Sequence, residues 1–368
     1  MLCLNMIVRN EAAIIERALA SVATQLSYWV VCDTGSTDGT QDIVQRFFRE
    51  RGIPGELHEF PFENFSSARN RALDAARRSA GRFDYLLLMD ADMELRVVED
   101  AFRAGLGQHA YQVRQKAGIS YYNTRLVRRD VPATYKGVTH EYLELPSPAA
   151  RLDAIWFADG ANGSNRVGKF DRDAALLTDA LKSEPDNARY VFYLAQSYRD
   201  AGRLDLALET YRRRQLMAGW DEERWYAVLQ EARCLRLLGR DDAFIARAMQ
   251  AYNERPGRAE PLYDLALHYR LKGQYEAAML FALSAFRLPR PLGDSLFVED
   301  HIYDYGIRQE ISIAGYYCAS LEDRQAGHAA CASLAANTAL PAEVRALAET
   351  NLRYYRENGA AGHRRGVS

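Results

Sequence analysis

The chain has 368 residues, enough for two domains with separate cores, and its 47 basic and 49 acidic residues leave a formal net charge of −2. This balance excludes the strongly basic footprint of a general nucleic-acid-binding protein. No run of about 18 apolar residues is present, so we expect no transmembrane segment, and the short apolar N-terminus indicates a strand rather than a signal peptide. The five cysteines are scattered without a CxxC spacing, and we interpret them as buried, reduced thiols of a cytoplasmic protein.

Short apolar runs alternate with amphipathic segments from the N-terminus to about residue 105. The apolar runs predict strands, and the segments between them have the spacing of helices, the third of which is expected over 65–79. The four predicted strands cover residues 2–8, 28–32, 55–60 and 84–89. This order implies an α/β domain with a mostly parallel sheet and helices on both faces. Two alternating segments, 111–113 and 124–127, predict a small antiparallel addition.

Two carboxylates follow the fourth predicted strand, in the run YLLLMDAD. Asp90 and Asp92 are spaced i, i+2, so their side chains point the same way in an extended chain. They lie at the carboxyl end of a buried strand, where open α/β sheets bind their ligands. Hard carboxylate oxygens there suit Mg²⁺ or Mn²⁺ shared with a phosphate. The alternative is a strand that simply ends in a turn.

Two earlier segments bring further polar side chains to the same edge. The second strand ends in VVCDTGSTDGT, where Asp33 could accept the N–H of a pyrimidine or bind ribose hydroxyls. The alternative for this segment is a turn with a helix cap, and we interpret Asp38 as a cap rather than a ligand. The segment FSSARNRA places Arg69 and Asn70 early in a helix that points at the strand ends, or else on a solvated face beside Arg71. The first strand is not followed by GxGxxG, which argues against dinucleotide binding.

Taken in order, LNMIVRNE, VVCDTGSTDGT, FSSARNRAL and LLLMDAD resemble the family 2 glycosyltransferases of the GT-A fold, over about residues 2–95. The resemblance implies sugar transfer from a nucleotide sugar, with inversion at the anomeric carbon. It implies that Asp90 faces ribose or the metal and that Asp92 is the main ligand of Mn²⁺ or Mg²⁺, which would neutralise the leaving diphosphate. The remaining residues that it assigns to the nucleotide site are Val8, Arg9, Glu11, Asp33 and Arg69.

A second candidate segment is YKGVTHEY, residues 135–142. It resembles the W/Y-x-G-x-x-H-E segment of some family 2 transferases that carry helical repeats. This likeness suggests His140 as a third metal ligand and Glu141 as the catalytic base, with Asp159 as the reserve candidate for the base. The alternative is a half-buried strand in which His140 makes an ordinary hydrogen bond. The segment 158–169 is expected to be either a mobile loop that closes over the diphosphate or a plain linker.

From about residue 170 the pattern becomes helical and repeats. Three alanines, spaced 37 and then 34 residues apart, are each followed seven residues later by a glycine: Ala195, Ala232 and Ala266, then Gly202, Gly239 and Gly273. This helix–turn–helix pattern resembles the tetratricopeptide repeat over about 185–290. We therefore predict a GT-A domain over 1–169, a helical repeat domain over 170–357 and a flexible tail over 358–368. Aromatic residues of the repeats are expected to be mostly core, with some on a concave face for a partner.

We expect a cytoplasmic, metal-dependent glycosyltransferase that moves a hexosyl or N-acetylhexosaminyl group from a UDP-sugar to a protein, peptide or saccharide acceptor. The repeat domain is a candidate surface for homodimerisation. The rival hypothesis is a tetratricopeptide-repeat scaffold with an inactive transferase domain, against which the intact Asp33, Asp90 and Asp92 argue. A sugar-phosphate nucleotidyltransferase would need a glycine-rich, basic loop after the first strand, and residues 8–11 do not form one.

Overall fold

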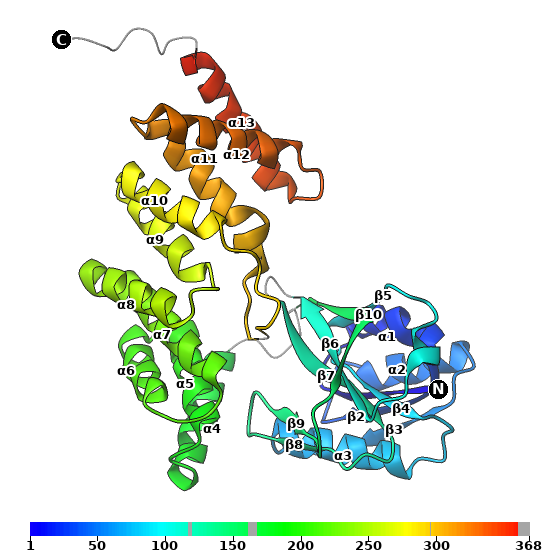
Figure 1. Cartoon of the computed structure of the whole chain (residues 1–368). Helices are drawn as coiled ribbons and strands as arrows, with labels where there is room; N and C mark the ends of the chain where they lie inside the picture. The colour runs from blue at the N-terminus through cyan, green and yellow to red at the C-terminus, as the bar shows by residue number, and fades with distance from the viewer. Residues whose placement is uncertain (117–119, 161–167, 295, 360–368) are drawn as a thin grey trace, which may run out of the picture. The chain divides into compact units, whose positions relative to one another are not determined.

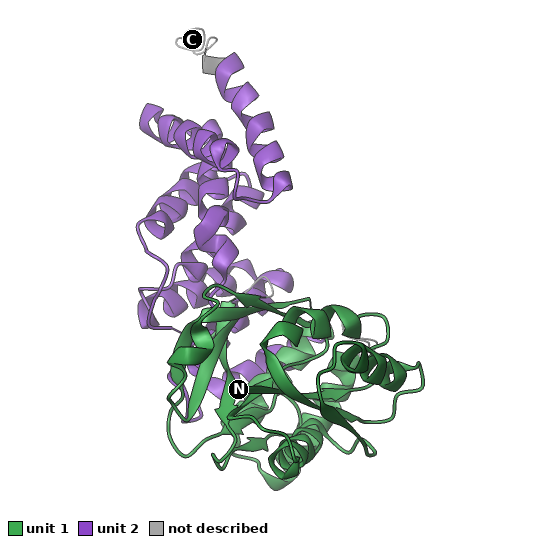
Figure 2. Cartoon of the chain, turned by 90° about the vertical axis from the view of Figure 1, so that its right-hand side faces the viewer, with its two compact units in different colours: residues 1–202, 295–297 green, residues 203–294, 298–368 purple. Residues whose placement is uncertain are grey.

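The computed structural model describes residues 1–116, 120–160, 168–294 and 296–359. The chain forms two compact units, residues 1–202 with 295–297 and residues 203–294 with 298–368 (Figure 2). The change from strands to helices lies between β10 (Ala150–Asp159) and α4 (Lys169–Ser183), as the repeat pattern suggests. Nevertheless α4 and α5 (Ala188–Asp200) belong to the first unit, together with the sheet.

The first unit is built on an eight-stranded sheet with the order β3-β2-β1-β4-β7-β6-β10-β5 (Figure 1). Parallel pairing joins β1 to β2 and β4, and β2 to β3, which confirms the expected α/β fold. The strand bounds are β1 Leu2–Val8, β2 Leu26–Asp33, β3 Gly55–Glu59, β4 Tyr85–Leu88, β5 Met93–Val97, β6 Ala110–Lys116 and β7 Ser120–Arg128. The addition is larger than the antiparallel pair expected: β7 and β6 pair antiparallel and extend the main sheet, and β10 then pairs parallel with β6 and antiparallel with β5.

Helices cover both faces of this sheet because the strand side chains alternate. On one face Leu4 and Met6 of β1 pack with buried residues of α1 (Ile15–Val22) and α2 (Thr40–Glu50). On the other face Cys3 of β1 packs with Ala72 and Leu73 of α3 (Phe65–Arg78). Since β1, β2 and β4 run in the same direction, their carboxyl ends meet at one edge. A separate two-stranded sheet, β8 (Thr134–Lys136) with β9 (Tyr142–Glu144), belongs to the same unit.

The second unit is helical (Figure 1). The turns at Gly239 and Gly273 of this unit, and at Gly202, the last residue before it, have φ of 70°, 72° and 74°, a left-handed conformation that favours glycine. The alanines that precede them are fully buried, so the predicted helix–turn–helix units are present. The elements are α6 Leu204–Gln215, α7 Asp221–Leu237, α8 Asp241–Glu254, α9 Glu260–Leu271, α10 Tyr275–Phe286, η3 Ile302–Gly306, α11 Ile307–Tyr317, α12 Leu321–Ala336 and α13 Ala342–Gly359. The predicted tail lies outside the described residues from residue 360 onward.

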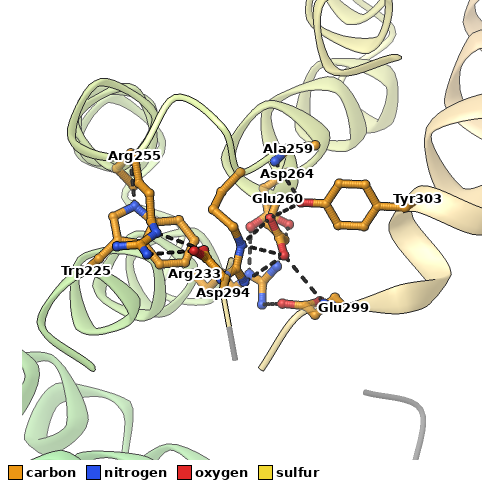
Figure 3. A network of polar contacts seen from close by, with 11 residues as sticks. Trp225, Arg233, Arg255, Ala259, Glu260, Asp264, Asp294, Glu299 and Tyr303 are labelled. Atoms are coloured by element: carbon orange, nitrogen blue, oxygen red, sulfur yellow. Dashed lines mark hydrogen bonds and ion pairs between the residues drawn. The ribbon is translucent and has the colours of Figure 1, made fainter. Parts of the chain in front are cut away.

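A network of buried charges fixes the segment between α10 and η3 to α7 and α9 (Figure 3). Arg233 of α7 pairs with Asp264 of α9 at 2.6 Å and with Glu299 at 2.5 Å. Arg258, just before α9, pairs with Glu260 at 2.7 Å and with Asp294 at 3.0 Å. Because removing one partner of a buried pair leaves an uncompensated charge, this network strongly favours a single position for the segment.

The expected burial of the cysteines is confirmed. All five cysteines are buried free thiols. In the part of the chain that the structure describes, none of the helices has both the length and the apolar character needed to cross a bilayer. Among the aromatic residues of the repeats, Trp225 is buried in the helical core, whereas Trp220 is 43% exposed.

Candidate functional site

Asp33, at the end of β2, is fully buried. Its Oδ1 accepts the backbone N–H groups of Gly35 at 2.8 Å and of Ser36 at 2.7 Å. Its Oδ2 is buried and has no hydrogen-bond partner within the described residues. A buried polar atom without a partner is destabilising, so this oxygen has the capacity to accept an N–H or O–H of a ligand.

The turn around Asp33 is interlocked with the end of β1. The carbonyl of Val8 accepts both the N–H and the hydroxyl of Thr34, at 3.0 and 3.1 Å. The Asp38 carboxylate accepts the N–H and hydroxyl of Thr40, the first residue of α2, and the N–H of Ala12. Burial opposes ionisation of Asp38, but these hydrogen bonds outweigh it and lower its pKa. Asp38 thus holds the start of α2 to the segment after β1, although the N-cap of α2 is Gly39 rather than Asp38. Arg9, by contrast, is exposed, and Glu11 is partly buried.

Asp90 lies two residues after the end of β4, between two guanidinium groups. Nη2 of Arg69 donates to its Oδ1 at 2.6 Å, and Nη1 and Nη2 of Arg125 donate to its Oδ2 at 3.3 Å. Burial alone would raise the pKa of Asp90, but Arg69 and then Arg125 lower it to about 2. Asp90 is therefore ionised at neutral pH, and both of its oxygens already accept hydrogen bonds from the protein.

Arg125 is a residue of this site that the sequence analysis missed. It lies on β7, its side chain is only 7% exposed, and its Nε donates to Oε1 of the fully buried Gln115 at 3.0 Å. Its Nη1 also donates to the carbonyl of Leu88 at 3.4 Å. The sequence feature that could have identified it is an arginine inside the predicted strand 124–127. A charged residue that is buried in a strand needs a partner of opposite charge.

Arg69 joins two carboxylates. Asn64 caps α3 by accepting the N–H of Ser67 at 2.8 Å, which fixes the turn that carries Arg69. Nη2 of Arg69 donates to Asp90, and Nε of Arg69 donates to Oε1 of Glu141 at 2.5 Å. The next residue, Asn70, exchanges two hydrogen bonds with the backbone of Tyr135 on β8, at 2.7 and 2.9 Å. The α3 residues predicted from FSSARNRA thus contact the segment that contains Glu141.

Asp92, in the turn just before β5, lies near Asp159. Asp159 ends β10 and is paired in register with Met93 of β5, and the N–H of Gly160 donates to the carbonyl of Asp92 at 2.9 Å. Burial, then the charge of Asp90, then that of Asp159 raise the pKa of Asp92. A divalent cation would relieve the burial of like charges at this point, so this donor set fits Mg²⁺ or Mn²⁺.

His140 faces a helix that follows the sheet in sequence. Its ring stacks on that of Tyr193 of α5, with 4.1 Å between centroids and 7° between planes, and its carbonyl accepts from Nη2 of Arg189 at 3.1 Å. Burial, followed by the charges of Lys169 and Arg189, lowers the pKa of His140 to about 3. The imidazole is therefore neutral at neutral pH, the form that can bind a metal.

The described residues contain one set of three ligand-type side chains with ligand atoms within 4.8 Å of one another: Glu276, Cys318 and Asp323, in the second unit. Asp90, Asp92 and His140 do not form such a set, so their joint role as metal ligands stays a prediction. Of the segment predicted at 158–169 to be a loop or a linker, residues 161–167 lie outside the described residues.

Comparison with known proteins gives a family for the N-terminal part. Residues 3–97 match the model of glycosyl transferase family 2. Over 90 residues the chain is 44% identical to a TPR repeat-containing protein of Synechococcus elongatus, a match that covers 24% of this chain and 20% of that protein. The chain thus spans about a fifth of the length of this relative.

Solved structures with some similarity include tetratricopeptide-repeat proteins. A crystal structure of MamA matches 55% of this chain and 91% of its own, with 16% identity and a TM-score of 0.34. A thermophilic TPR protein of Thermus thermophilus matches 51% of this chain and 92% of its own, with 18% identity and a TM-score of 0.35. Scores this low do not define a common fold. The evidence for the repeats is therefore the pattern of buried alanines and turn glycines. Residues 3–97 thus match glycosyl transferase family 2, and the helices of the second unit have a tetratricopeptide-like pattern.

Proposed function

We propose that this chain is a divalent-metal-dependent glycosyltransferase that uses a UDP-sugar as donor. The observation that carries the proposal is the buried Oδ2 of Asp33, which has no hydrogen-bond partner among the residues that the structure describes and lies at the same sheet edge as the carboxylates that follow β4. β2 and β4 flank β1, so their ends are about 10 Å apart at the usual strand spacing. Asp33 and Asp92 can therefore bind the two ends of one nucleoside diphosphate.

Each of these side chains has a chemical part in the proposal. Oδ2 of Asp33 accepts the imide N–H of uracil, a donor that a cytosine ring lacks at this position. Asp92 holds a divalent cation, which when bound neutralises the charge that develops on the leaving diphosphate. Asp90 keeps Arg69 and Arg125 in place beside this centre, since each of its oxygens is bonded to one of them.

We assign the removal of the acceptor proton to Asp159 rather than Glu141. Oε1 of Glu141 accepts a hydrogen bond from the guanidinium of Arg69, and the same guanidinium donates to Asp90. One oxygen of Glu141 is therefore already engaged. Asp159 lies beside Asp92 at the end of β10, where an acceptor would approach the donor sugar. A base must come within hydrogen-bond reach of the acceptor hydroxyl or amide, and Asp159 is the better placed of the two.

Calorimetry with UDP, in the presence and absence of Mn²⁺, tests the proposal. Asp33→Asn keeps the shape of the side chain but replaces an acceptor, so we expect UDP affinity to fall by about 1–3 kcal/mol, or about 5- to 150-fold. Asp92→Asn should abolish the gain in affinity from Mn²⁺. Asp38→Asn is the matched control, because it alters a structural carboxylate of the same turn and should leave UDP affinity unchanged.

The outcomes separate the two main hypotheses. A wild-type chain that binds no nucleotide with any divalent cation would contradict the transferase and favour the scaffold. A chain that binds UDP as well after Asp33→Asn as before would return Asp33 to a purely structural role.

A further inference from the structure

The connection between β8 and β9, residues 137–141, is a strained loop. Gly137 has φ of 110° and His140 has φ of 49°, the left-handed region that a residue with a side chain rarely adopts. A Cβ at Gly137 would lie 3.3 Å from Cα of Glu141 and from the carbonyl oxygen of Thr139, so the loop is also tightly closed. A strained backbone of this kind persists only where surrounding contacts hold it.

Helices α4 and α5 supply those contacts on one side of the loop. The hydroxyl of Thr139 donates to Oδ1 of Asp173 on α4 at 3.4 Å. Arg189 of α5 donates to the carbonyl of His140, and its guanidinium lies 4.8 Å from the ring centroid of Tyr193, on which the His140 ring stacks. Asn187 caps α5 by accepting the N–H of Tyr190, which fixes the turn that carries Arg189.

The other side of the loop leads to the candidate nucleotide and metal site. Glu141, the residue after His140, accepts from Nε of Arg69, and Nη2 of the same guanidinium donates to Asp90. His140 and Glu141 are adjacent in a closed loop, so a shift of one moves the other. A continuous chain of contacts therefore runs from α5 through the loop and Arg69 to Asp90, all within the first compact unit.

We propose that Arg189 and Tyr193 are positioning residues for the transfer reaction, which hold the 137–141 loop and thereby the Arg69–Asp90 pair beside Asp92. The inference rests on the proposed function of this site. Its physical basis is that Arg69 must satisfy two carboxylates at once: if Glu141 moves, the guanidinium reorients and Asp90 loses its fixed geometry. Helices α4 and α5, which the sequence pattern assigns to the start of the repeat domain, would then help to position the residues of the candidate site.

The test uses the full chain with substitutions in α5. Tyr193→Ala removes the stacked ring, and Tyr193→Phe keeps it. We expect Tyr193→Ala to lower kcat by about 10- to 100-fold, the usual effect of losing a group that orients a catalytic residue, with KM for the donor within about twofold. Tyr193→Phe should keep the wild-type kcat. Arg199→Met, on the same helix, is the control and should also behave as wild type.

Hydrogen exchange of the unliganded chain provides a readout that needs no substrate. In Tyr193→Ala the backbone amides of the 137–141 loop should exchange at least about tenfold faster, and those around Arg69 and Asp90 should follow, while α7 is unchanged. If Tyr193→Ala does not yield folded protein, Arg189→Met is measured in its place, with Arg189→Lys as its conservative partner.

Each outcome decides the proposal. Faster exchange of the loop with kcat within twofold of wild type would show that the loop is not coupled to the reaction, and unchanged exchange would show that α5 does not hold the loop. Either result overturns the inference but leaves the transferase intact. A wild-type chain that binds no nucleotide sugar refutes the proposed function, and this inference with it.

Discussion

Replacing Arg125 by methionine tests whether charge holds Asp90 in place. Methionine fills much of the same volume on β7 but removes the two guanidinium bonds to Oδ2 of Asp90 and the bond to Gln115. Both partners are largely shielded from solvent, with side-chain exposures of 7% for Arg125 and 23% for Asp90. The substitution therefore leaves a nearly buried carboxylate with only Arg69 as partner, and we expect a clear loss of stability.

The size of the loss follows from the pKa of Asp90 and from the bonds that disappear. The fall from the ordinary value of 3.8 to about 2 corresponds to about 2 kcal/mol of stabilisation at neutral pH. Arg69 is the larger contributor, so the share of Arg125 is about 1 kcal/mol. Its lost bonds to Gln115 and the Leu88 carbonyl leave buried acceptors unpaired, which adds about 1–2 kcal/mol. We expect Arg125→Met to lower the free energy of unfolding by about 2–3 kcal/mol at pH 7.

Urea unfolding at pH 7 and at pH 3 checks this reasoning, because the charge contribution depends on pH with a known sign. The folded pKa of Asp90 is depressed, so its contribution is complete above the unfolded value near 3.8 and is lost as the pH falls toward about 2. The difference between variant and wild type should therefore narrow at pH 3. An equal difference at both pH values would show that packing, not charge, was lost. Arg128→Met, at an exposed pair on the same strand, is the control and should unfold as wild type does.

Two further predictions concern the neighbouring loop and the base. The pKa of His140 is depressed from 6.5 to about 3, so its stabilisation is complete above pH 6.5 and falls by up to about 1.4 kcal/mol per pH unit as the pH drops. His140→Asn should remove this slope between pH 6.5 and 5 in urea unfolding; an unchanged slope would exclude His140 as its source. Asp159→Asn should lower turnover by about 10²- to 10⁴-fold with little change in UDP affinity, and Glu141→Gln should lower it less. The opposite order of kcat values would assign the base to Glu141.

Much of the first unit could be predicted because its signals are local. The continuous apolar run at residues 2–8 is β1, and the helix expected at 65–79 is α3, Phe65–Arg78. The parallel order then places Asp33 and Asp90 at one edge without further information. The strand β5, Met93–Val97, was not expected, although its sequence alternates, because its partner β10 lies more than fifty residues later in the chain.

The family resemblance assigned different roles to the two carboxylates, but their different surroundings could not be predicted from spacing, because these depend on the order of the strands beyond β4. Spacing of i, i+2 treats Asp90 and Asp92 alike. The structure places Arg125 beside Asp90 because β7 pairs with β4, and it places Asp159 beside Asp92 because β10 pairs with β5. Hydrophobic periodicity predicts each strand but not which strands pair with it. These contacts therefore cannot be predicted from the sequence pattern. The stacking of His140 on Tyr193 is non-local in the same way.

The difference between the two aspartates of the DAD run bears on where a cation would bind. Both oxygens of Asp90 accept bonds from guanidinium groups, and these lower its pKa to about 2, so its charge is already compensated. The surroundings of Asp92 act in the opposite direction, because burial and two neighbouring carboxylates raise its pKa. A cation gains most where the protein itself compensates a negative charge least. We therefore expect Asp92 to be the stronger metal ligand of the pair, with Asp90 mainly holding Arg69 and Arg125 beside it.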